Sequence, residues 1–346
     1  MHPTVSIIIV TYNGYAYINR CVQSIVDNPY KEKQIIIVDN GSTDGTVKLL
    51  KSKYSNINII ALPKNIGPSA ARNEGIKQAT GEYVMFLDND TQIHKNTITE
   101  ALKIFEQNKN LGLIQCKLLF THDPTLLDCT GEYVGQWGFL VHRTEVGQND
   151  DNATKPETVF SAKSAGMIIR GKTLDEIGGF DPDYFIYLEE TDLAWRAWHH
   201  GYKALYVPKS IVYHESGTSS IILSKKAHDY NGKFHGCKNY ILTLIKNLEL
   251  KNLVKILPIH IILWVGLAYY SLLQGKIQPW IWIHQAIWWN IWHIHSTLRK
   301  RMQVQKNRQC TDDEILPQIM KKKPLSYYTN KVKYIKVGNA EGFIKS

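Results

Sequence analysis

The sequence predicts an α/β protein with a mostly parallel central sheet flanked by helices, followed by a helical segment at the C-terminal end. Three observations predict this. Buried-strand patterns alternate with helical stretches over the first 90 residues, polar side chains follow the strand ends, and the composition changes after residue 239. We expect a domain over residues 1–245, an apolar helical segment over 246–310 and a basic tail over 311–346.

Strands and helices alternate in the first part of the chain. Continuous apolar, β-branched runs are typical of strands covered on both faces, and they lie at 5–12, 34–42, 57–62 and 83–88. Helical stretches separate them, at 17–26, 43–54 and 69–79. This order predicts βαβ units, whose strands lie parallel.

The later elements are less regular. A short strand is expected at 165–170, and a helix at 190–201 is expected to stop at Gly201, the residue type that best ends a helix. Two short strands, ALYVP and SIVYH, follow and end at His214.

Polar residues fall at three strand ends: Thr11, Tyr12 and Asn13, then Asp39 and Asn40, then Asp88 and Asp90. Parallel sheets bind ligands beyond the carboxyl ends of their strands. Such residues are also common in turns, but three ends in succession favour a binding site. No GxGxxG follows the first strand and no GxxxxGK[ST] occurs, which disfavours a nicotinamide site and a phosphate-binding P-loop.

Asp88 and Asp90 stand one residue apart where the fourth strand ends, in YVMFLDNDTQ. Carboxylate oxygens suit hard divalent cations, Mg²⁺ or Mn²⁺. A site with few protein ligands takes its remaining ligands from substrate phosphate and water. The pair therefore predicts a metal-assisted site for a diphosphate.

The C-terminal segment is apolar and rich in tryptophan. Its two apolar stretches lie at 256–273 and 279–295, and six of the nine tryptophans lie between 264 and 292. Tryptophan favours the water–lipid interface, so the segment is interpreted as an amphipathic hairpin lying on a membrane. A soluble helical pair packed on the domain, or on a second copy in a homodimer, is the alternative.

Charge is unevenly distributed along the chain. Residues 225–346 carry 20 Lys+Arg against 6 Asp+Glu, whereas residues 1–224 carry 21 against 25. A basic end suggests an anionic surface, and its long apolar runs favour membrane over nucleic acid. The five cysteines lack metal or disulfide spacing, and MHPTVSIIIV lacks a charged leader. We expect a cytoplasmic protein peripherally associated with the inner face of the cell membrane.

Four segments resemble the family-2 inverting glycosyltransferases with the GT-A fold, and among them the rhamnosyltransferase-like group: VSIIIVTYNG, IIIVDNGSTDGT, NIGPSAARNEGIKQATGEYVMFLDND and GGFDPDYFIYLEETDLAWRAWHHGYK. The resemblance covers about residues 5–245. It implies a GT-A type nucleotide-diphospho-sugar transferase fold over the first domain. It also implies a hexosyltransferase-type enzyme that moves a sugar from a UDP, dTDP or GDP donor to a glycan or lipid-linked saccharide.

The resemblance also implies residue roles. Nucleotide binding falls to Thr11, Tyr12, Asn13, Asp39, Asn40, Arg72 and Asp88, and metal binding to Asp90, Asp88 and His214. Donor or acceptor sugar contacts fall to Ala165, Gly166, Trp137 and Trp195. The family's catalytic base lies in a Glu-Asp pair at a helix start, where this sequence has Glu189-Glu190 and then Asp192. Glu190 is the favoured base, Asp192 the competing one, and three helix-start acids are also expected from the helix dipole alone.

Two other functions remain open at this point. A nucleotidyltransferase making nucleotide-sugars would also use a βα pocket, but TYNGYAYINRC is not the Gly-rich, basic loop that such enzymes carry. The replacement of the usual Asp by Glu190 leaves room for a catalytically impaired membrane-binding protein.

Overall fold

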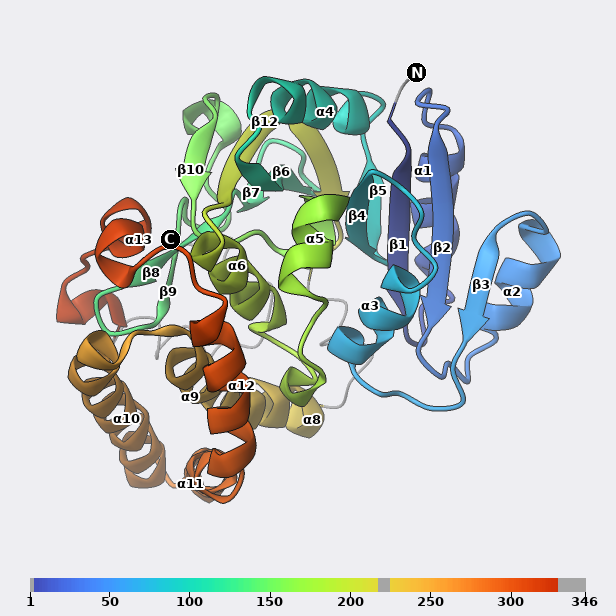
Figure 1. The fold of residues 1–346 in the computed structure, drawn as a ribbon. Coiled ribbons are helices and arrows are strands. Elements are labelled where there is room, and N and C mark those ends of the chain that lie inside the picture. Colours follow the sequence, from blue (N-terminus) through green and yellow to red (C-terminus); the bar gives the residue numbers. More distant parts are fainter. Residues whose placement is uncertain (1–2, 217–224, 329–346) are drawn as a thin grey trace.

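The computed structural model describes residues 3–216 and 225–328 (Figure 1). The part of the expected basic tail at 329–346 lies outside the described residues.

A ten-stranded mixed sheet forms the centre of the fold, in the order β10-β12-β6-β11-β4-β1-β2-β3, with β5 paired to β12 and β7 to β6. Its first strands are β1 (Val5–Thr11), β2 (Lys33–Asp39), β3 (Asn58–Ala61) and β4 (Tyr83–Asp88). The others are β5 (Thr91–Ile93), β6 (Leu111–Phe120), β7 (Leu127–Cys129), β10 (Glu157–Val159), β11 (Met167–Arg170) and β12 (Lys203–His214).

The first four strands pair in parallel, as the sequence predicts. The other half is mixed, because β11 runs antiparallel between β4 and β6 while β6 and β12 are parallel. The two short strands predicted on either side of Pro208 are one strand, β12, with an irregularity in register between Val207 and Ile211.

Helices cover both faces of the sheet: α1 (Ile18–Val26), α2 (Thr46–Lys53), α3 (Pro68–Ile76), α4 (Thr97–Gln107), α5 (Gly171–Ile177) and α6 (Glu189–His199). Successive residues of β1 point to opposite faces. Ile7 and Ile9 pack in the cluster that holds α1 and α4. Ile8 and Val10 pack in the cluster that holds α3, α5 and α6. Gly201, with φ of 81°, follows the end of α6 as predicted.

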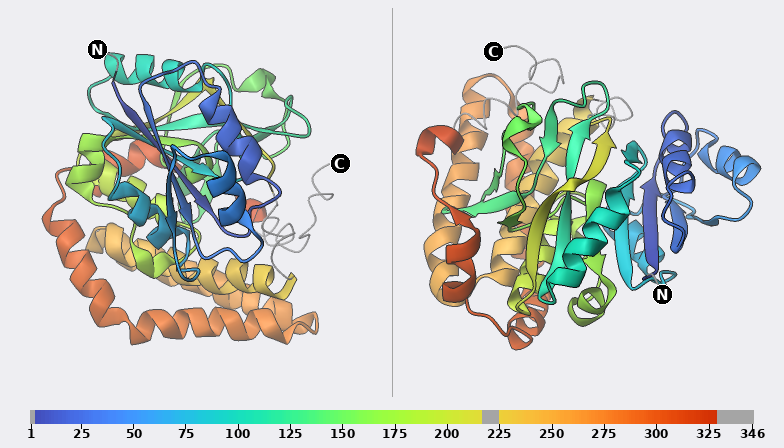
Figure 2. Two further views of the ribbon diagram at one scale, coloured as in Figure 1. Left: turned by 90° about the vertical axis from the view of Figure 1, so that its right-hand side faces the viewer. Right: turned by 90° about the horizontal axis from the view of Figure 1, so that it is seen from above.

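The C-terminal helices gather on one side of the molecule, away from β1–β3 (Figures 1 and 2). They are α8 (Lys225–Tyr230), the π-helical turn η4 (Asn231–His235), α9 (Gly236–Asn247), α10 (Leu250–Leu273), α11 (Ile277–Trp292), α12 (Ile294–Lys306) and α13 (Asp312–Ile319). A small second sheet joins β8 (Glu132–Gly135), β9 (Leu140–His142) and β13 (Met320–Lys321).

Helix α9 is buried between the sheet domain and the outer helices. Leu242 packs in one cluster with Tyr184 and Trp195 of the sheet domain, whereas Cys237 packs with Trp264 and Ile283 of α10 and α11. The boundary expected after residue 245 therefore falls inside a buried helix rather than in a linker.

Candidate active site

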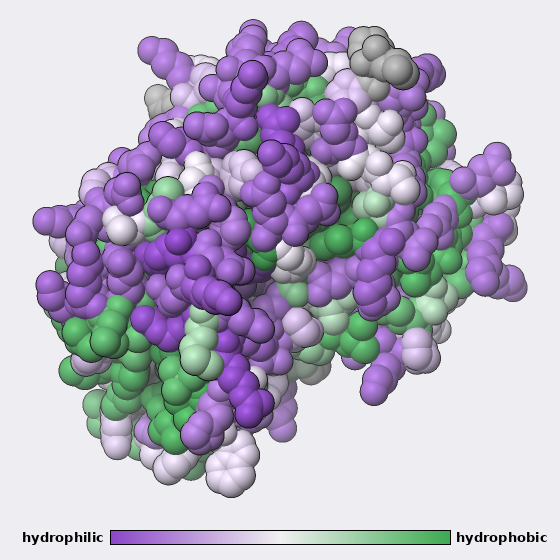
Figure 3. Space-filling model, viewed as in Figure 1, coloured by the Kyte–Doolittle hydropathy of each residue, from purple (hydrophilic) through white to green (hydrophobic). Residues whose placement is uncertain are grey.

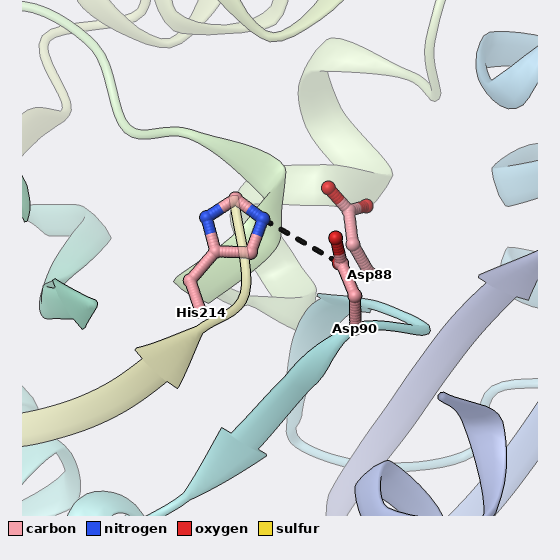
Figure 4. A group of neighbouring side chains, drawn as sticks. All are labelled: Asp88, Asp90 and His214. Atoms are coloured by element: carbon pink, nitrogen blue, oxygen red, sulfur yellow. Dashed lines mark ion pairs between the residues drawn. The ribbon is translucent and has the colours of Figure 1, made fainter. Parts of the chain in front are cut away.

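Two aspartates and a histidine converge beyond the end of β4. Asp88 is the last residue of β4, and Asp90 follows in the turn to β5. Antiparallel pairing of β5 with β12 sets His214 opposite Thr91, which brings the imidazole over this turn (Figure 4). One possible ligand atom from each of Asp88, Asp90 and His214 lies within 4.8 Å of the others.

Asp128, from β7, holds the other side of the His214 ring. His214 Nδ1 donates to Asp128 Oδ2 at 2.8 Å, and His214 Nε2 lies 3.4 Å from Asp90 Oδ1. Burial acts to lower the pKa of His214, but the bonds to Asp128 and Asp90 outweigh it and raise the pKa to about 10. Burial likewise acts to raise the pKa of Asp128, and the His214 bond lowers it to about 2. Nothing in the sequence ties Asp128 to a histidine 86 residues away.

The three side chains fit a divalent cation. Two carboxylates and one imidazole give a mixed oxygen and nitrogen set, which Mn²⁺ accepts more readily than Mg²⁺. The carboxylate of Asp128 on the far ring nitrogen is the arrangement that fixes the tautomer of a metal-binding histidine. The Asp88 side chain is one-third exposed, so the cluster is accessible to solvent at Asp88.

Arg72 connects this cluster to the start of α6. Its guanidinium donates to Asp88 Oδ1 at 3.0 Å and to Glu189 Oε1 at 2.7 Å, and the Arg72 and Glu189 side chains are almost fully buried. The sequence predicts Arg72 near the nucleotide base or the diphosphate. In the structure its side chain is already bonded to two carboxylates. Glu189 is its partner through Oε1, and the Oε2 atom of Glu189 is buried without a hydrogen-bond partner.

Glu190 differs from the two acids beside it. Within the described residues it forms no salt bridge, whereas Glu189 and Asp192 each do. Its Oε2 atom, like that of Glu189, is buried without a hydrogen-bond partner. Burial, reinforced by the neighbouring Glu189, raises its pKa well above the ordinary carboxyl value. A carboxyl group with a raised pKa and an unused oxygen is chemically suited to take up a proton.

Asp192 is bonded to a different set of side chains. It is fully buried, and it pairs with Lys246 at 2.8 Å and with Arg196 at 3.0 Å. Asn247 also donates to it at 2.9 Å. Burial acts to raise its pKa, but the two cations outweigh burial and lower it. The expectation that Asp192 competes as the base therefore falls on a carboxylate whose two oxygens are bonded to side chains of α9 and α6.

The strand-end residues beyond β1 and β2 form a second polar group. Asp39 is buried; its Oδ2 accepts from the Ser42 amide at 3.0 Å, and its Oδ1 has no partner. Thr11 Oγ1 accepts from Asn89 at 3.1 Å, and Asn13 Oδ1 accepts from the Thr43 amide at 2.9 Å. Asp39 thus offers an unused acceptor.

Asn40, unlike Asp39, has both of its side-chain polar atoms in hydrogen bonds within the protein. The Asn40 side chain donates to Asn65 Oδ1 at 3.0 Å and accepts from the Ile66 amide at 2.9 Å. Asn40 therefore holds the loop before α3, and its side-chain groups are used there. Tyr12 is half-buried beside this group.

The residues expected to contact sugars lie mainly in the core. Trp195 is 1% exposed and packs edge-on against Phe160, so its ring offers no face to a sugar. A Cβ at Gly166 would meet Leu118 at 2.5 Å, so its small size serves packing beneath the sheet rather than sugar access. Ala165 is also buried, and the Trp137 ring packs against Tyr328.

Comparisons with known proteins assign the family. The chain matches the models for glycosyl transferase family 2 over residues 6–126 and for glycosyl transferase family group 2 over residues 83–298. With an α/β sheet that carries an acidic cluster at its strand ends, these matches define a family-2 glycosyltransferase of GT-A-like fold. The chain belongs to glycosyl transferase family 2.

Two curated relatives illustrate the likeness. The O-antigen chain rhamnosyltransferase WbaN of Salmonella anatum is 27% identical over 242 residues, 69% of this chain and 74% of that protein. The poly-β-1,6-N-acetyl-D-glucosamine synthase of Staphylococcus epidermidis is 25% identical over 209 residues, 60% of this chain and 48% of that protein. The chain spans somewhat less than half the length of the first curated relatives it matches.

Solved structures share the fold. The mannosyltransferase PcManGT from Pyrobaculum calidifontis, solved with GDP-Man and Mn²⁺, superposes with a TM-score of 0.52 at 14% identity over 89% of this chain and 86% of that one. GalNAc-T7, solved with UDP, GalNAc and Mn²⁺, gives 0.52 at 16% identity over 79% and 58%.

Proposed function

We propose that this protein is an inverting glycosyltransferase that moves a sugar from a nucleotide-diphosphate donor to a hydroxyl group of a saccharide. The observation that carries the proposal is the convergence of Asp88, Asp90 and His214 within 4.8 Å, joined through Arg72 to the acids that begin α6. A cation held there, Mn²⁺ or Mg²⁺, would act as a Lewis acid that neutralises the departing diphosphate.

The chain's own groups supply the rest of the reaction. The unused Oδ1 of Asp39 would accept from the base edge of the nucleotide. Glu190 would take the proton of the acceptor hydroxyl as its oxygen attacks the anomeric carbon. The bond from that carbon to the diphosphate oxygen breaks in the same displacement, through an oxocarbenium-like transition state. The nucleotide diphosphate leaves and the anomeric centre inverts.

The comparisons support the donor class. Two proteins of the same fold are described with GDP-Man or UDP together with Mn²⁺, and one relative is named a rhamnosyltransferase. These findings support a nucleotide-diphosphate sugar as the donor of the present chain, with UDP, dTDP and GDP as the candidate nucleotides.

Calorimetric binding of UDP, dTDP and GDP, each with Mn²⁺ and with EDTA, tests the donor site. We expect one nucleotide to bind with Mn²⁺, to bind at least about tenfold more weakly with EDTA, and to lose its metal dependence in Asp90→Ala. Asp123→Ala, which removes an acid whose side chain bonds locally to Thr125, is the matched control. No binding under any condition would overturn the proposal of an active transferase.

We further propose that the acceptor is presented at a membrane surface. Large apolar side chains stand exposed along α10, α11 and α12; they include Ile262 (67%), Leu273 (87%), Trp288 (65%) and Trp292 (83%). Figure 3 shows apolar surface where Figure 1 places α10. By length and composition α10 is long and apolar enough to cross a membrane.

Charge favours an anionic lipid surface as the occupant of this face. Residues 250–311 contain no Asp or Glu and eight Lys or Arg. A second copy of the chain would bring the same basic segment against itself and would be repelled, whereas anionic headgroups attract it. A lipid-linked or membrane-bound saccharide is therefore the proposed acceptor, which gives a cytoplasmic enzyme held at the inner face of the membrane.

Vesicle flotation tests this surface. We expect binding to phosphatidylglycerol-containing vesicles that weakens with salt, and at least about a tenfold loss in the pair Trp288→Ser and Trp292→Ser. Val26→Ser, an exposed apolar residue at the end of α1, is the control and should bind as wild type. Absence of binding, or a salt-stable dimer that the Trp substitutions dissociate, would overturn the membrane proposal.

A further inference from the structure

The loop that leads into Glu189-Glu190 has an unusual backbone. Phe185, Tyr187 and Leu188 have φ values of 61°, 70° and 66°, and none of them is glycine. Phe185 has ψ of −69°, and the Ile186 amide donates to the Tyr184 carbonyl at 2.7 Å. These angles describe a γ-turn with positive φ, a rare and strained conformation. Such a loop keeps its shape only if its surroundings hold it.

Asn239 of α9 holds this loop from one side. It is fully buried, and its Nδ2 group lies within hydrogen-bond distance of three carbonyls of the loop. The distances are 2.9 Å to Tyr184 O, 2.7 Å to Ile186 O and 2.7 Å to Tyr187 O. One side-chain amide thus contacts the peptide group before Phe185 and the peptide groups on both sides of Tyr187.

The opposite side of the loop rests on the start of α3. The Ser69 amide and hydroxyl donate to the Phe185 carbonyl at 3.4 and 3.3 Å. A Cβ at Gly67 would meet the Phe185 ring at 2.6 Å, so only glycine lets the ring lie there. The same helix α3 carries Arg72, which binds Asp88 and Glu189. The loop is therefore held between α3, whose Arg72 bonds to Asp88 of the candidate metal site, and α9.

We infer that Asn239 is a positioning residue, which fixes the loop Tyr184–Leu188 and thereby the direction in which the Glu190 carboxyl points at the start of α6. This inference rests on the proposed role of Glu190 as the base. It makes α9, which follows the strand bearing His214 and lies outside the central sheet, a part of the active site. A one-ångström displacement of a catalytic group is enough to reduce turnover strongly.

A matched pair of variants separates positioning from general stability. Asn239→Leu keeps the side-chain volume and removes the donors. Asn290→Leu makes the same change at another buried asparagine, whose Nδ2 donates to the Lys238 and Ala286 carbonyls and does not touch the loop. If Asn239→Leu does not fold, Asn239→Gln, which moves the amide outward by one methylene, replaces it.

Three measurements on the full chain test the inference: hydrogen exchange of the amides of residues 185–192, Mn²⁺-dependent nucleotide binding, and kcat and KM for the donor. For Asn239→Leu we expect exchange in this segment about tenfold faster, binding and KM within about twofold of wild type, and kcat lower by about 10² or more. Asn290→Leu should change none of them. Equal effects of the two substitutions, or an unchanged kcat in Asn239→Leu, would overturn the inference.

The controls also separate this inference from the proposed function. A wild-type chain that binds no nucleotide and transfers no sugar would overturn the proposed function, and with it the role given to Glu190. The exchange comparison would then still decide whether Asn239 holds the loop, since it requires no turnover.

Discussion

At the scale of single residues, the site assigns different chemistry to similar side chains. Glu189, Glu190 and Asp192 lie within one turn of α6. Glu189 neutralises Arg72, Asp192 neutralises Lys246 and Arg196, and Glu190 pairs with no cation among the described residues. Neighbouring charge and burial, rather than residue type, therefore decide which carboxyl can act as a base.

The acid Glu190 sets the expected pH dependence. Because burial and Glu189 raise its pKa, it gains its charge only above the range of an exposed glutamate, so kcat/KM should rise with pH on a limb that lies above that range. Glu190→Gln should lower kcat by about 10²–10⁴ and leave nucleotide binding intact. A pH–rate profile of wild type and variant measures both. A variant as active as wild type would exclude Glu190 as the base.

The acid Asp128 should control metal affinity without touching the metal. Asp128→Asn removes the carboxylate that orients His214, so we expect Mn²⁺ affinity to fall by about 10–100-fold. Titration calorimetry of Mn²⁺ in the presence of the bound nucleotide measures the change. Asp123→Asn, an acid of the β6–β7 connection, should leave the affinity unchanged. Equal affinities for wild type and Asp128→Asn would remove Asp128 from the metal site.

At the scale of elements, α9 is tied to α6 by buried charge. Lys246 of α9 contacts both Asp192 and Asp181, and its side chain is 3% exposed. Charges taken out of water must be paired to be tolerated. The two helices therefore form one unit, although Asp192 and Lys246 lie 54 positions apart in the sequence and no sequence pattern connects them.

Removing the Asp192 carboxylate, which pairs with Arg196 and Lys246, should destabilise the fold. Asp192→Ala leaves Arg196 and Lys246 underpaired in the interior, and we expect a loss of about 3–5 kcal/mol in the free energy of unfolding. Because the folded-state pKa of Asp192 is lowered, its contribution is present above about pH 4 and is lost as the pH falls below that value. Urea unfolding at pH 7, and at a series of pH values below about 4, measures both effects. Glu74→Ala, which breaks the exposed pair with Lys77, should cost less than about 1 kcal/mol.

At the scale of the whole molecule, the outer helices complete the protein. Helix α9 packs against both the sheet domain and the helices α10 and α11. A stretch at residues 320–321 also returns to pair with β8. The apolar segment after residue 245 is thus packed against α9 and the sheet domain on its inner side.

A chain that ends at residue 245 should therefore fail to fold. The cut removes Lys246 and Asn247, leaves Asp192 buried without two of its partners, and exposes the apolar faces of α9. We expect aggregation or the loss of a cooperative thermal transition in circular dichroism. A chain that ends at residue 328 keeps every described element and serves as the control. A cooperative, soluble 1–245 chain would show that the domain boundary lies there after all.

The sequence by itself determined the alternating parallel half of the sheet, because each buried strand is a local apolar run and each helix a local periodic one. It also predicted Asp88, Asp90 and Asp39 as candidate site residues, since polar residues at strand ends are local signals. Only the tertiary structure decided which of three neighbouring acids is unpaired, that Asp128 backs His214, and that Asn239 holds the loop before Glu190. These contacts join residues 52 to 86 positions apart. Their partners are chosen by packing, strand register and burial, which no local pattern encodes.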